Sequence, residues 1–318
     1  ALAHQGQVRN SGEAYITHPL AVAEILADQR MDGEALCAAI LHDALEDTAL
    51  PRSFIADTFG ESVAEMVEGV TKLDKIQFNN RQEADAESFR KMMLAMSRDI
   101  RVILIKLADR SHNMRTLSDM PVEKWRRIAS ETLDIYVPIA NRLGLNQTYR
   151  ELQDLAFRYL RPWRYQVLEK AVMKARSRRR DLLQKLQRDV EGAFKNANLS
   201  IHIFGREKTL YSIYQKMGQK HLSFAQVTDI YGMRILVPNL IDCYTGLGIL
   251  HQLYKPVPGK FKDHIAISKV NGYQSLHTTL VGPAGINVEF QLRTDAMHVV
   301  AESGVAAHWM YKTSDPVH

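Results

Sequence analysis

The chain has 318 residues, of which 46% are hydrophobic and 24% are charged, and its formal net charge is +5. This length suits two domains of common size, and no apolar stretch approaches the roughly 20 residues of a membrane span. We therefore expect a soluble globular protein without a signal peptide or membrane segment, whose positive charge favours anionic partners such as nucleotides or RNA.

The chain is expected to be a cytoplasmic fragment of a longer protein. Its only cysteines, Cys37 and Cys243, lie far apart in apolar helical patterns, so buried thiols in a reducing compartment are favoured over a disulfide. The chain lacks an initiating Met and begins within a helical pattern, and a regulatory segment is expected after His318.

Three parts are predicted along the chain. Apolar residues recur at three- and four-residue spacing up to about residue 160, which predicts an all-α domain over residues 1–140. Residues 141–198 are predicted to form a helical connector whose basic residues are interrupted by acids, so a solvated helix face is favoured over a nucleic-acid stripe. Alternating residues separated by Gly and Pro predict an α+β domain over residues 199–318.

Two imidazoles and two carboxylates are spread over three helices predicted in the first domain. His18 precedes Pro19, which suits the first turn of a helix, and His42–Asp43 and Asp109 lie on two further helices. This set of nitrogen and oxygen ligands suits a catalytic divalent transition metal that leaves positions open for water and phosphate. The domain is therefore predicted to be a metal-dependent phosphohydrolase.

A pair of acids follows this His-Asp motif. Glu46 and Asp47 come three to five positions after His42–Asp43, so helical geometry places them about one turn away. Carboxylates that do not bind the metal can orient or deprotonate a water whose pKa the metal lowers. Glu46 and Asp47 are our candidates for general acid and base.

The helix of Asp109 carries two neutral polar residues on the same side. Asn113 and Thr116 follow Asp109 by four and seven positions, an arrangement that suits a ligand carrying hydroxyls. His112 and His4 are alternative partners, but lone histidines are more often structural or exposed than metal ligands.

Two acids also stand out in the second domain. Residues 286–293 alternate strictly, which places Glu289 and Gln291 on one face of a strand, and Asp229 lies just before a strand that carries Arg234. Two carboxylates on neighbouring strands commonly hold Mg²⁺ against nucleotide phosphates, because this small cation prefers oxygen ligands. Asp229 and Glu289 are therefore predicted to form a magnesium site.

Cations and one aromatic ring surround these acids in the sequence. Tyr273 offers a flat face for a base, and His277 and nearby lysines offer phosphate contacts. The basic candidates are Arg206, Lys208, Lys216 and the loop of residues 255–269.

Taken in order, these motifs resemble the catalytic half of the long RelA/SpoT proteins, the bifunctional synthetase/hydrolases of ppGpp and pppGpp. The resemblance is nearest to the SpoT type and covers essentially the whole chain. It is carried by Tyr15–Pro19, Leu41–Asp43, Glu46–Thr48, Lys106–Arg110, Gly205–Lys208, Asp229–Tyr231, Asn271–His277 and Glu289–Thr294.

For the first domain the resemblance implies an all-α HD-type hydrolase that removes the 3′-pyrophosphate from (p)ppGpp and releases GDP or GTP. By this resemblance, Mn²⁺ would be held by His18, His42, Asp43 and Asp109, with Glu46 and Asp47 as the catalytic acids and Arg9, Asn113 and Thr116 near the guanosine.

For the second domain the resemblance implies an α+β, polymerase-β-like nucleotidyltransferase that transfers pyrophosphate from ATP to the 3′-oxygen of GDP or GTP. Asp229 and Glu289 match the acids that bind Mg²⁺ and activate the 3′-hydroxyl. The matching nucleotide contacts are Arg206 and Arg234 around adenine, Lys208 and Lys216 at the ATP phosphates, and Tyr273 as the guanine platform with Lys269, Asn271, His277 and Gln291 nearby. The longer protein is expected to contact the ribosome or regulatory proteins through its C-terminal region.

One departure leaves the strength of synthesis and the choice between GDP and GTP open. The chain has Lys260-Phe261-Lys262-Asp263 where bifunctional members carry Arg-x-Lys-Asp, and Lys lacks the planar fork of Arg. Two alternatives stay open: a hydrolase whose second domain mainly binds nucleotide and regulates, or an RNA- or ribosome-binding module, which the basic helical connector suggests.

Overall fold

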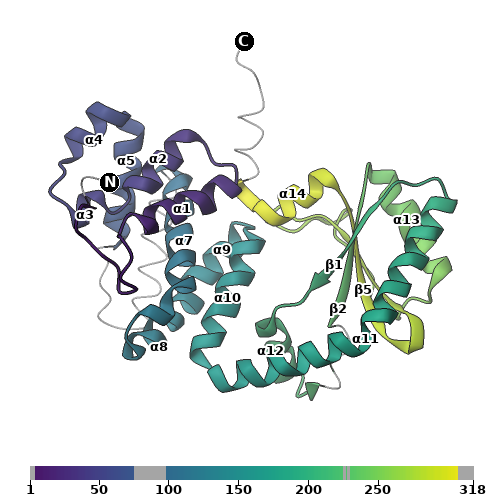
Figure 1. Cartoon of the computed structure of the whole chain (residues 1–318). Helices are drawn as coiled ribbons and strands as arrows, with labels where there is room; N and C mark the ends of the chain where they lie inside the picture. The colour runs from purple at the N-terminus through teal and green to yellow at the C-terminus, as the bar shows by residue number, and fades with distance from the viewer. Residues whose placement is uncertain (1–3, 75–97, 225–226, 228–229, 307–318) are drawn as a thin grey trace, which may run out of the picture. The chain divides into compact units, whose positions relative to one another are not determined.

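The computed structural model (Figure 1) packs the chain into two compact units, which are residues 1–160 with 305–318 (unit 1) and residues 161–304 (unit 2). No helix among the described residues is long and apolar enough to cross a membrane. Both cysteines are free thiols, Cys243 buried and Cys37 half-buried. The structure describes residues 4–74, 98–224, 227 and 230–306.

Unit 1 is all-α in its described residues, which confirms the fold class predicted for this part of the chain. Its central helix, α7, contacts α1, α2, α5 and α10, and its apolar residues from Val102 to Leu107 are buried among them. The helices are α1 (Thr17–Asp28), α2 (Gly33–Leu41), α3 (Ala44–Asp47), α4 (Arg52–Phe59), α5 (Glu61–Asp74), α7 (Ile100–Arg115), α8 (Val122–Glu131), α9 (Val137–Arg142) and α10 (Asn146–Leu160).

One arginine joins the N-terminal ends of three helices in unit 1. Arg101 is 9% exposed, and its guanidinium contacts Asp32 at 3.0 Å, Glu34 at 2.9 Å and Asp99 at 2.7 Å. Asp32 also caps α2, and Asp99 caps α7. Since its Nη2 also donates to Ser62 of α5, Arg101 holds α2, α5 and α7 in register.

Replacing Arg101 by Met should lower the free energy of unfolding of unit 1 by roughly 1–3 kcal/mol, because three carboxylates would lose a shared, largely buried counter-ion. Urea unfolding followed by circular dichroism would measure the change. Arg127→Met is the matched control, because the Arg127 side chain is 71% exposed and pairs with Glu131 at 3.8 Å. An equal shift for both variants would contradict the role given to Arg101.

Unit 2 is an α+β structure with a mixed five-stranded sheet in the order β1-β2-β5-β4-β3, which confirms the predicted class. The neighbouring strands β2 and β5 are parallel, and the other pairs are antiparallel. The elements are α11 (Pro162–Asn196), β1 (His202–Glu207), α12 (Leu210–Gln219), β2 (Tyr231–Val237), α13 (Leu240–Leu253), β3 (Lys262–Asp263), β4 (Leu276–Val281), β5 (Asn287–Thr294) and α14 (Asp295–Ser303).

Strand β5 separates a core face from a polar face. Val288, Phe290 and Leu292 are fully buried, and α13 packs against β5. A Cβ added to Gly246 of α13 would come within 3.0 Å of the Leu292 and Phe194 side chains, so α13 approaches the sheet closely only because this residue is Gly. The alternation leaves Glu289 and Gln291 on the opposite face.

The structure divides the predicted connector, residues 141–198, between the two units. Leu152 and Ala156 of α10 are buried in the core of unit 1, whereas Leu186, Val190 and Phe194 of α11 are buried in unit 2. Each helix carries an apolar stripe that packs on its own unit, so neither behaves as a solvated linker.

Candidate functional site

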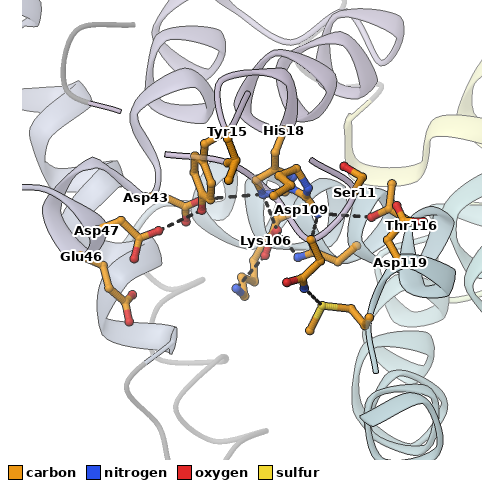
Figure 2. A pocket seen from close by; sticks show the side chains of 15 residues that line it. Ser11, Tyr15, His18, Asp43, Glu46, Asp47, Lys106, Asp109, Thr116 and Asp119 are labelled. Carbon is orange, nitrogen blue, oxygen red and sulfur yellow. Dashed lines mark hydrogen bonds and ion pairs between the residues drawn. The ribbon is translucent and has the colours of Figure 1, made fainter. Parts of the chain in front are cut away.

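Three buried side chains from different parts of unit 1 form a cluster with the chemistry of a metal site. His18 lies in α1, His42 follows the end of α2, and Asp109 lies in α7. Their candidate ligand atoms all lie within 4.8 Å of one another. Asp109 Oδ1 lies 3.2 Å from His18 Nε2 and 4.0 Å from His42 Nε2. Figure 2 shows His18 and Asp109 at the centre of the adjoining pocket.

Both imidazoles are oriented so that Nε2 faces the cluster. His42 Nδ1 donates to the Ala39 carbonyl at 2.7 Å, and its buried Nε2 faces Asp43 at 3.0 Å and Asp109 at 4.0 Å. His18 Nδ1 lies 2.8 Å from His112 Nδ1. Burial is the largest cause that lowers the pKa of His112 to about 4, so a neutral His112 can accept this hydrogen bond. Two imidazole nitrogens and a carboxylate oxygen that converge on one space fit a bound divalent metal.

Asp43, the predicted fourth ligand, adjoins this cluster. Its Oδ2 lies 3.0 Å from His42 Nε2 and 3.7 Å from His18 Nε2, and it accepts a hydrogen bond from Tyr15 Oη at 2.6 Å. Burial opposes ionisation of Asp43, but the hydrogen bond and charge of His42 outweigh it and lower the pKa of Asp43 below its usual value. The carboxylate is therefore ionised beside the two imidazoles.

The cluster opens into a pocket of about 510 Å³, a volume typical of small-ligand sites. Glu46 and Asp47 are exposed and line one side, and Figure 2 shows Thr116 and Asp119 on the other. Asp47 Oδ2 accepts a hydrogen bond from Tyr15 Oη at 2.9 Å. The structure thus places the predicted acid pair in the pocket that adjoins the cluster of His18, His42 and Asp109.

The three residues predicted near guanosine share one wall of this pocket. Arg9 Nη2 lies 3.2 Å from Thr116 Oγ1 and 3.4 Å from Asn113 Oδ1. Asn113 Nδ2 in turn donates to Asp109 Oδ1 at 2.6 Å. Arg9 sits in a tight turn that requires a positive φ of 86° at Gly12. Asn113 therefore links the cationic side chain of Arg9 to Asp109 of the His-Asp cluster.

No role was predicted from the sequence for two polar residues of this site, Tyr15 and Lys106. Tyr15 bridges Asp43 and Asp47, and Lys106 donates from Nζ to Asp109 Oδ2 at 2.8 Å. The spacing of Lys106 three positions before Asp109 on a helix could have indicated that pair. Tyr15 precedes its helix, and no periodicity relates it to its partners.

In unit 2, Glu289 lies at the centre of a polar cluster on the sheet. Its carboxylate contacts Arg206 at 3.3 Å and Lys208 at 3.0 Å and accepts from Gln291 Nε2 at 3.1 Å. His277 Nδ1 lies 3.7 Å away. Burial raises the pKa of Glu289, but the charges of Lys208 and Arg206 outweigh it and lower that pKa, so Glu289 is ionised.

Tyr273, the predicted base platform, adjoins this cluster. Tyr273 Oη lies 2.7 Å from His277 Nε2, and Lys269 Nζ lies 4.9 Å from the centre of the Tyr273 ring. Asn271 Oδ1 accepts from the Tyr273 backbone N–H at 3.3 Å. An aromatic face with a cation above it suits a stacked base.

The remaining predicted residues of unit 2 lie elsewhere. Arg234 is 7% exposed and pairs with Glu302 of α14 at 2.9 Å, and its guanidinium lies 5.5 Å from the Phe204 ring centre. Lys216 lies on α12. Asp229 lies outside the described residues, so the predicted pairing of Asp229 with Glu289 around Mg²⁺ stays a prediction.

Comparison with known proteins matches both units to family models. An HD domain model matches residues 1–146, and a model of the region found in RelA / SpoT proteins matches residues 205–316. The chain is similar to a guanosine-3′,5′-bis(diphosphate) 3′-pyrophosphohydrolase of Haemophilus influenzae, with 54% identity over 98% of this chain and 46% of that protein. It is also 54% identical to the bifunctional (p)ppGpp synthase/hydrolase SpoT of Escherichia coli, over 98% of this chain and 44% of that protein.

The chain thus spans about half the length of these curated relatives. Among solved structures, it is similar to small alarmone synthetase 1 from Bacillus subtilis bound to its product pppGpp. That likeness covers 46% of this chain and 84% of the other at 22% identity, with a TM-score of 0.37.

Proposed function

Because the chain belongs to the RelA/SpoT family, whose HD and RelA/SpoT regions it carries in order, we propose that it both destroys and makes ppGpp and pppGpp. Unit 1 removes the 3′-pyrophosphate and releases GDP or GTP. Unit 2 transfers pyrophosphate from ATP to the 3′-oxygen of GDP or GTP. The names of the relatives support both activities.

The observation that carries the hydrolase proposal is the buried cluster of His18, His42 and Asp109 at the base of a pocket that two exposed acids flank. These three residues, with Asp43 beside them, would hold Mn²⁺, for which imidazole and carboxylate ligands are suitable. A divalent cation bound there would lower the pKa of a water and polarise the pyrophosphate.

The side chains of unit 1 would then do the remaining chemistry. Asp47, which Tyr15 orients, accepts a proton from the attacking water, with Glu46 next to it. The water oxygen bonds to phosphorus as the bond from that phosphorus to the ribose 3′-oxygen breaks, and the 3′-oxygen takes up a proton that Asp47 or Glu46 returns. Arg9 and Thr116 hold the nucleoside, so the attacked phosphorus lies beside the acids.

In unit 2, Glu289 would accept the proton of the acceptor's 3′-hydroxyl. The 3′-oxygen then attacks the β-phosphorus of ATP, the bond from that phosphorus to the bridging oxygen breaks, and AMP leaves. Mg²⁺ held by Asp229 and Glu289 would neutralise charge on the phosphates. Arg206 and Lys208 now contact Glu289, so ATP phosphates must draw these cations away before Glu289 can act as a base.

A paired turnover assay tests the proposal, with Mn²⁺ and Mg²⁺ varied separately. We expect Mn²⁺-dependent release of pyrophosphate from ppGpp, and Mg²⁺-dependent formation of ppGpp from labelled ATP and GDP. Hydrolysis that proceeds equally well after chelation of all divalent cations would rule out the role given to the cluster.

A second candidate is a hydrolase whose unit 2 binds nucleotide only to regulate unit 1. The contacts of Arg206 and Lys208 with Glu289 favour it, as does Lys260 in place of the family's Arg. Tight ATP binding with no ppGpp formed at any Mg²⁺ concentration would select this candidate.

Replacing Tyr15 by Phe should lower kcat for ppGpp hydrolysis by roughly 10–100-fold, the usual effect of losing a partner of a metal-site ligand. The phenol hydroxyl contacts both Asp43 and Asp47, whereas the ring, which stacks on His4 at 4.8 Å, would stay in place. Steady-state kinetics would show a lower kcat with little change in KM. Tyr159→Phe, in the same unit but outside the residues that line the pocket, is the control. Equal kcat values for the two variants would show that the Tyr15 hydroxyl has no role in hydrolysis.

A further inference from the structure

A buried ammonium group lies against the metal cluster of unit 1. The side chain of Lys106 is 7% exposed and lines the pocket, and its Nζ lies 2.8 Å from Asp109 Oδ2. Burying a lysine is costly unless a partner compensates for the lost hydration. The neighbours of Lys106 on α7 are mostly apolar. A charged residue at this position therefore indicates a role in the site rather than in the core.

The two oxygens of Asp109 are divided between different partners. Oδ1 lies 3.2 Å from His18 Nε2 and accepts from Asn113 Nδ2 at 2.6 Å, whereas Oδ2 accepts from Lys106. Rotating the carboxylate to exchange its oxygens would break both hydrogen bonds at once. Only Oδ1 therefore points into the space between His18 and His42, where the ligand atoms converge.

We propose that Lys106 is a positioning residue that makes Asp109 a one-oxygen ligand of the hydrolase metal. The inference rests on the proposed metal-dependent hydrolysis. By holding Oδ2, Lys106 keeps Asp109 from closing on the cation with both oxygens. One coordination position then remains open for water or for a pyrophosphate oxygen, as a hydrolytic centre requires.

If Lys106 acted only through its charge, it would weaken metal binding rather than support it. A fixed positive charge repels a divalent cation, so its removal would tighten metal binding if electrostatics were the whole of its role. A positioning role predicts weaker binding when Lys106 is lost, because Asp109 would no longer be held in the geometry that the imidazoles require. The sign of the change in affinity therefore separates the two roles.

The test is Mn²⁺ titration of the whole chain, read by calorimetry and by the paramagnetic resonance spectrum of the bound ion. Lys106→Met keeps the length of the side chain and removes its donor, and we expect a Kd at least tenfold higher and an altered spectrum. Lys106→Gln, which retains an N–H donor, should recover part of the affinity and also serves if the Met variant fails to fold. Lys72→Met is the control, because Lys72 is 64% exposed and pairs with Glu68 on the surface of the same unit.

The outcomes separate this inference from the proposed function. Binding of Mn²⁺ by the unaltered chain and its loss in His42→Ala would establish the metal site itself, and absence of both would refute the proposed hydrolase centre. If the site exists but Lys106→Met binds Mn²⁺ as tightly as the unaltered chain, or more tightly, the positioning role is overturned while the proposed function stands.

Discussion

Replacing His42 by Ala is expected to abolish ppGpp hydrolysis while ppGpp synthesis from ATP and GDP continues. His42 is 2% exposed, and its Nε2 points at Asp43 and Asp109, so Ala would remove one of the converging metal-binding atoms. Losing a metal ligand forfeits several kcal/mol of transition-state stabilisation, which corresponds to a decrease in kcat on the order of 10³-fold or more.

Labelled ppGpp and Mn²⁺ would measure this loss, and labelled ATP with GDP and Mg²⁺ would measure synthesis by the same preparation. His202→Ala is the matched control, because His202 is exposed on β1 of unit 2 and should alter neither rate. Mn²⁺-dependent hydrolysis retained by His42→Ala would refute the assignment of the cluster. Loss of both activities would indicate a folding defect, which the melting temperature would reveal.

Replacing Glu289 by Gln should have the reverse effect, with synthesis lost and hydrolysis retained. Gln matches the size of Glu and can still accept from Lys208 and Arg206, so the cluster should stay packed. It cannot accept the proton of the acceptor's 3′-hydroxyl, and a general base contributes roughly 10²–10⁴-fold to rate. We expect kcat for synthesis to fall by at least about that factor, because Glu289 is proposed both as the base and as a ligand of Mg²⁺.

Initial rates of ppGpp formation at varied ATP would test this expectation. Glu191→Gln on the exposed side of α11 is the control, since its carboxylate contacts only Gln187 at 2.9 Å among the hydrogen bonds described for it. A Glu289→Gln protein that synthesises ppGpp at the rate of the control would exclude Glu289 as the base. Together with His42→Ala, the pair would show two separable active centres in one chain.

Much of the local geometry of both sites could be predicted from residue spacing. The four- and seven-residue steps from Asp109 to Asn113 and Thr116 placed these residues on one side of α7, and all three line the same pocket. Strand alternation likewise separated Glu289 from the buried Val288 and Phe290. A helix or a strand repeats its side-chain directions at a fixed period, so short-range neighbours are encoded directly in the sequence.

The extent of the units could be predicted less well. Residues 141–198 carry a basic, strongly helical pattern that suited a connector, but α10 buries Leu152 in unit 1 and α11 buries Phe194 in unit 2. Both helices have broad polar faces, so the overall composition of each helix is polar although it carries an apolar stripe. Which neighbour covers a stripe depends on packing between distant segments, and a single sequence does not state that.

The sequence by itself supplied the residues that suit this chemistry: the His and Asp residues suited to a metal, the acids one turn away, and the ordered motifs that resemble those of the RelA/SpoT proteins. Only the tertiary structure decided which of these groups meet. The packing of α1, α2 and α7 brought His18, His42 and Asp109 together, set His112 behind His18, and gave the two oxygens of Asp109 different partners. Such contacts depend on the distances and angles between helices, which follow from packing of the whole core rather than from any local period.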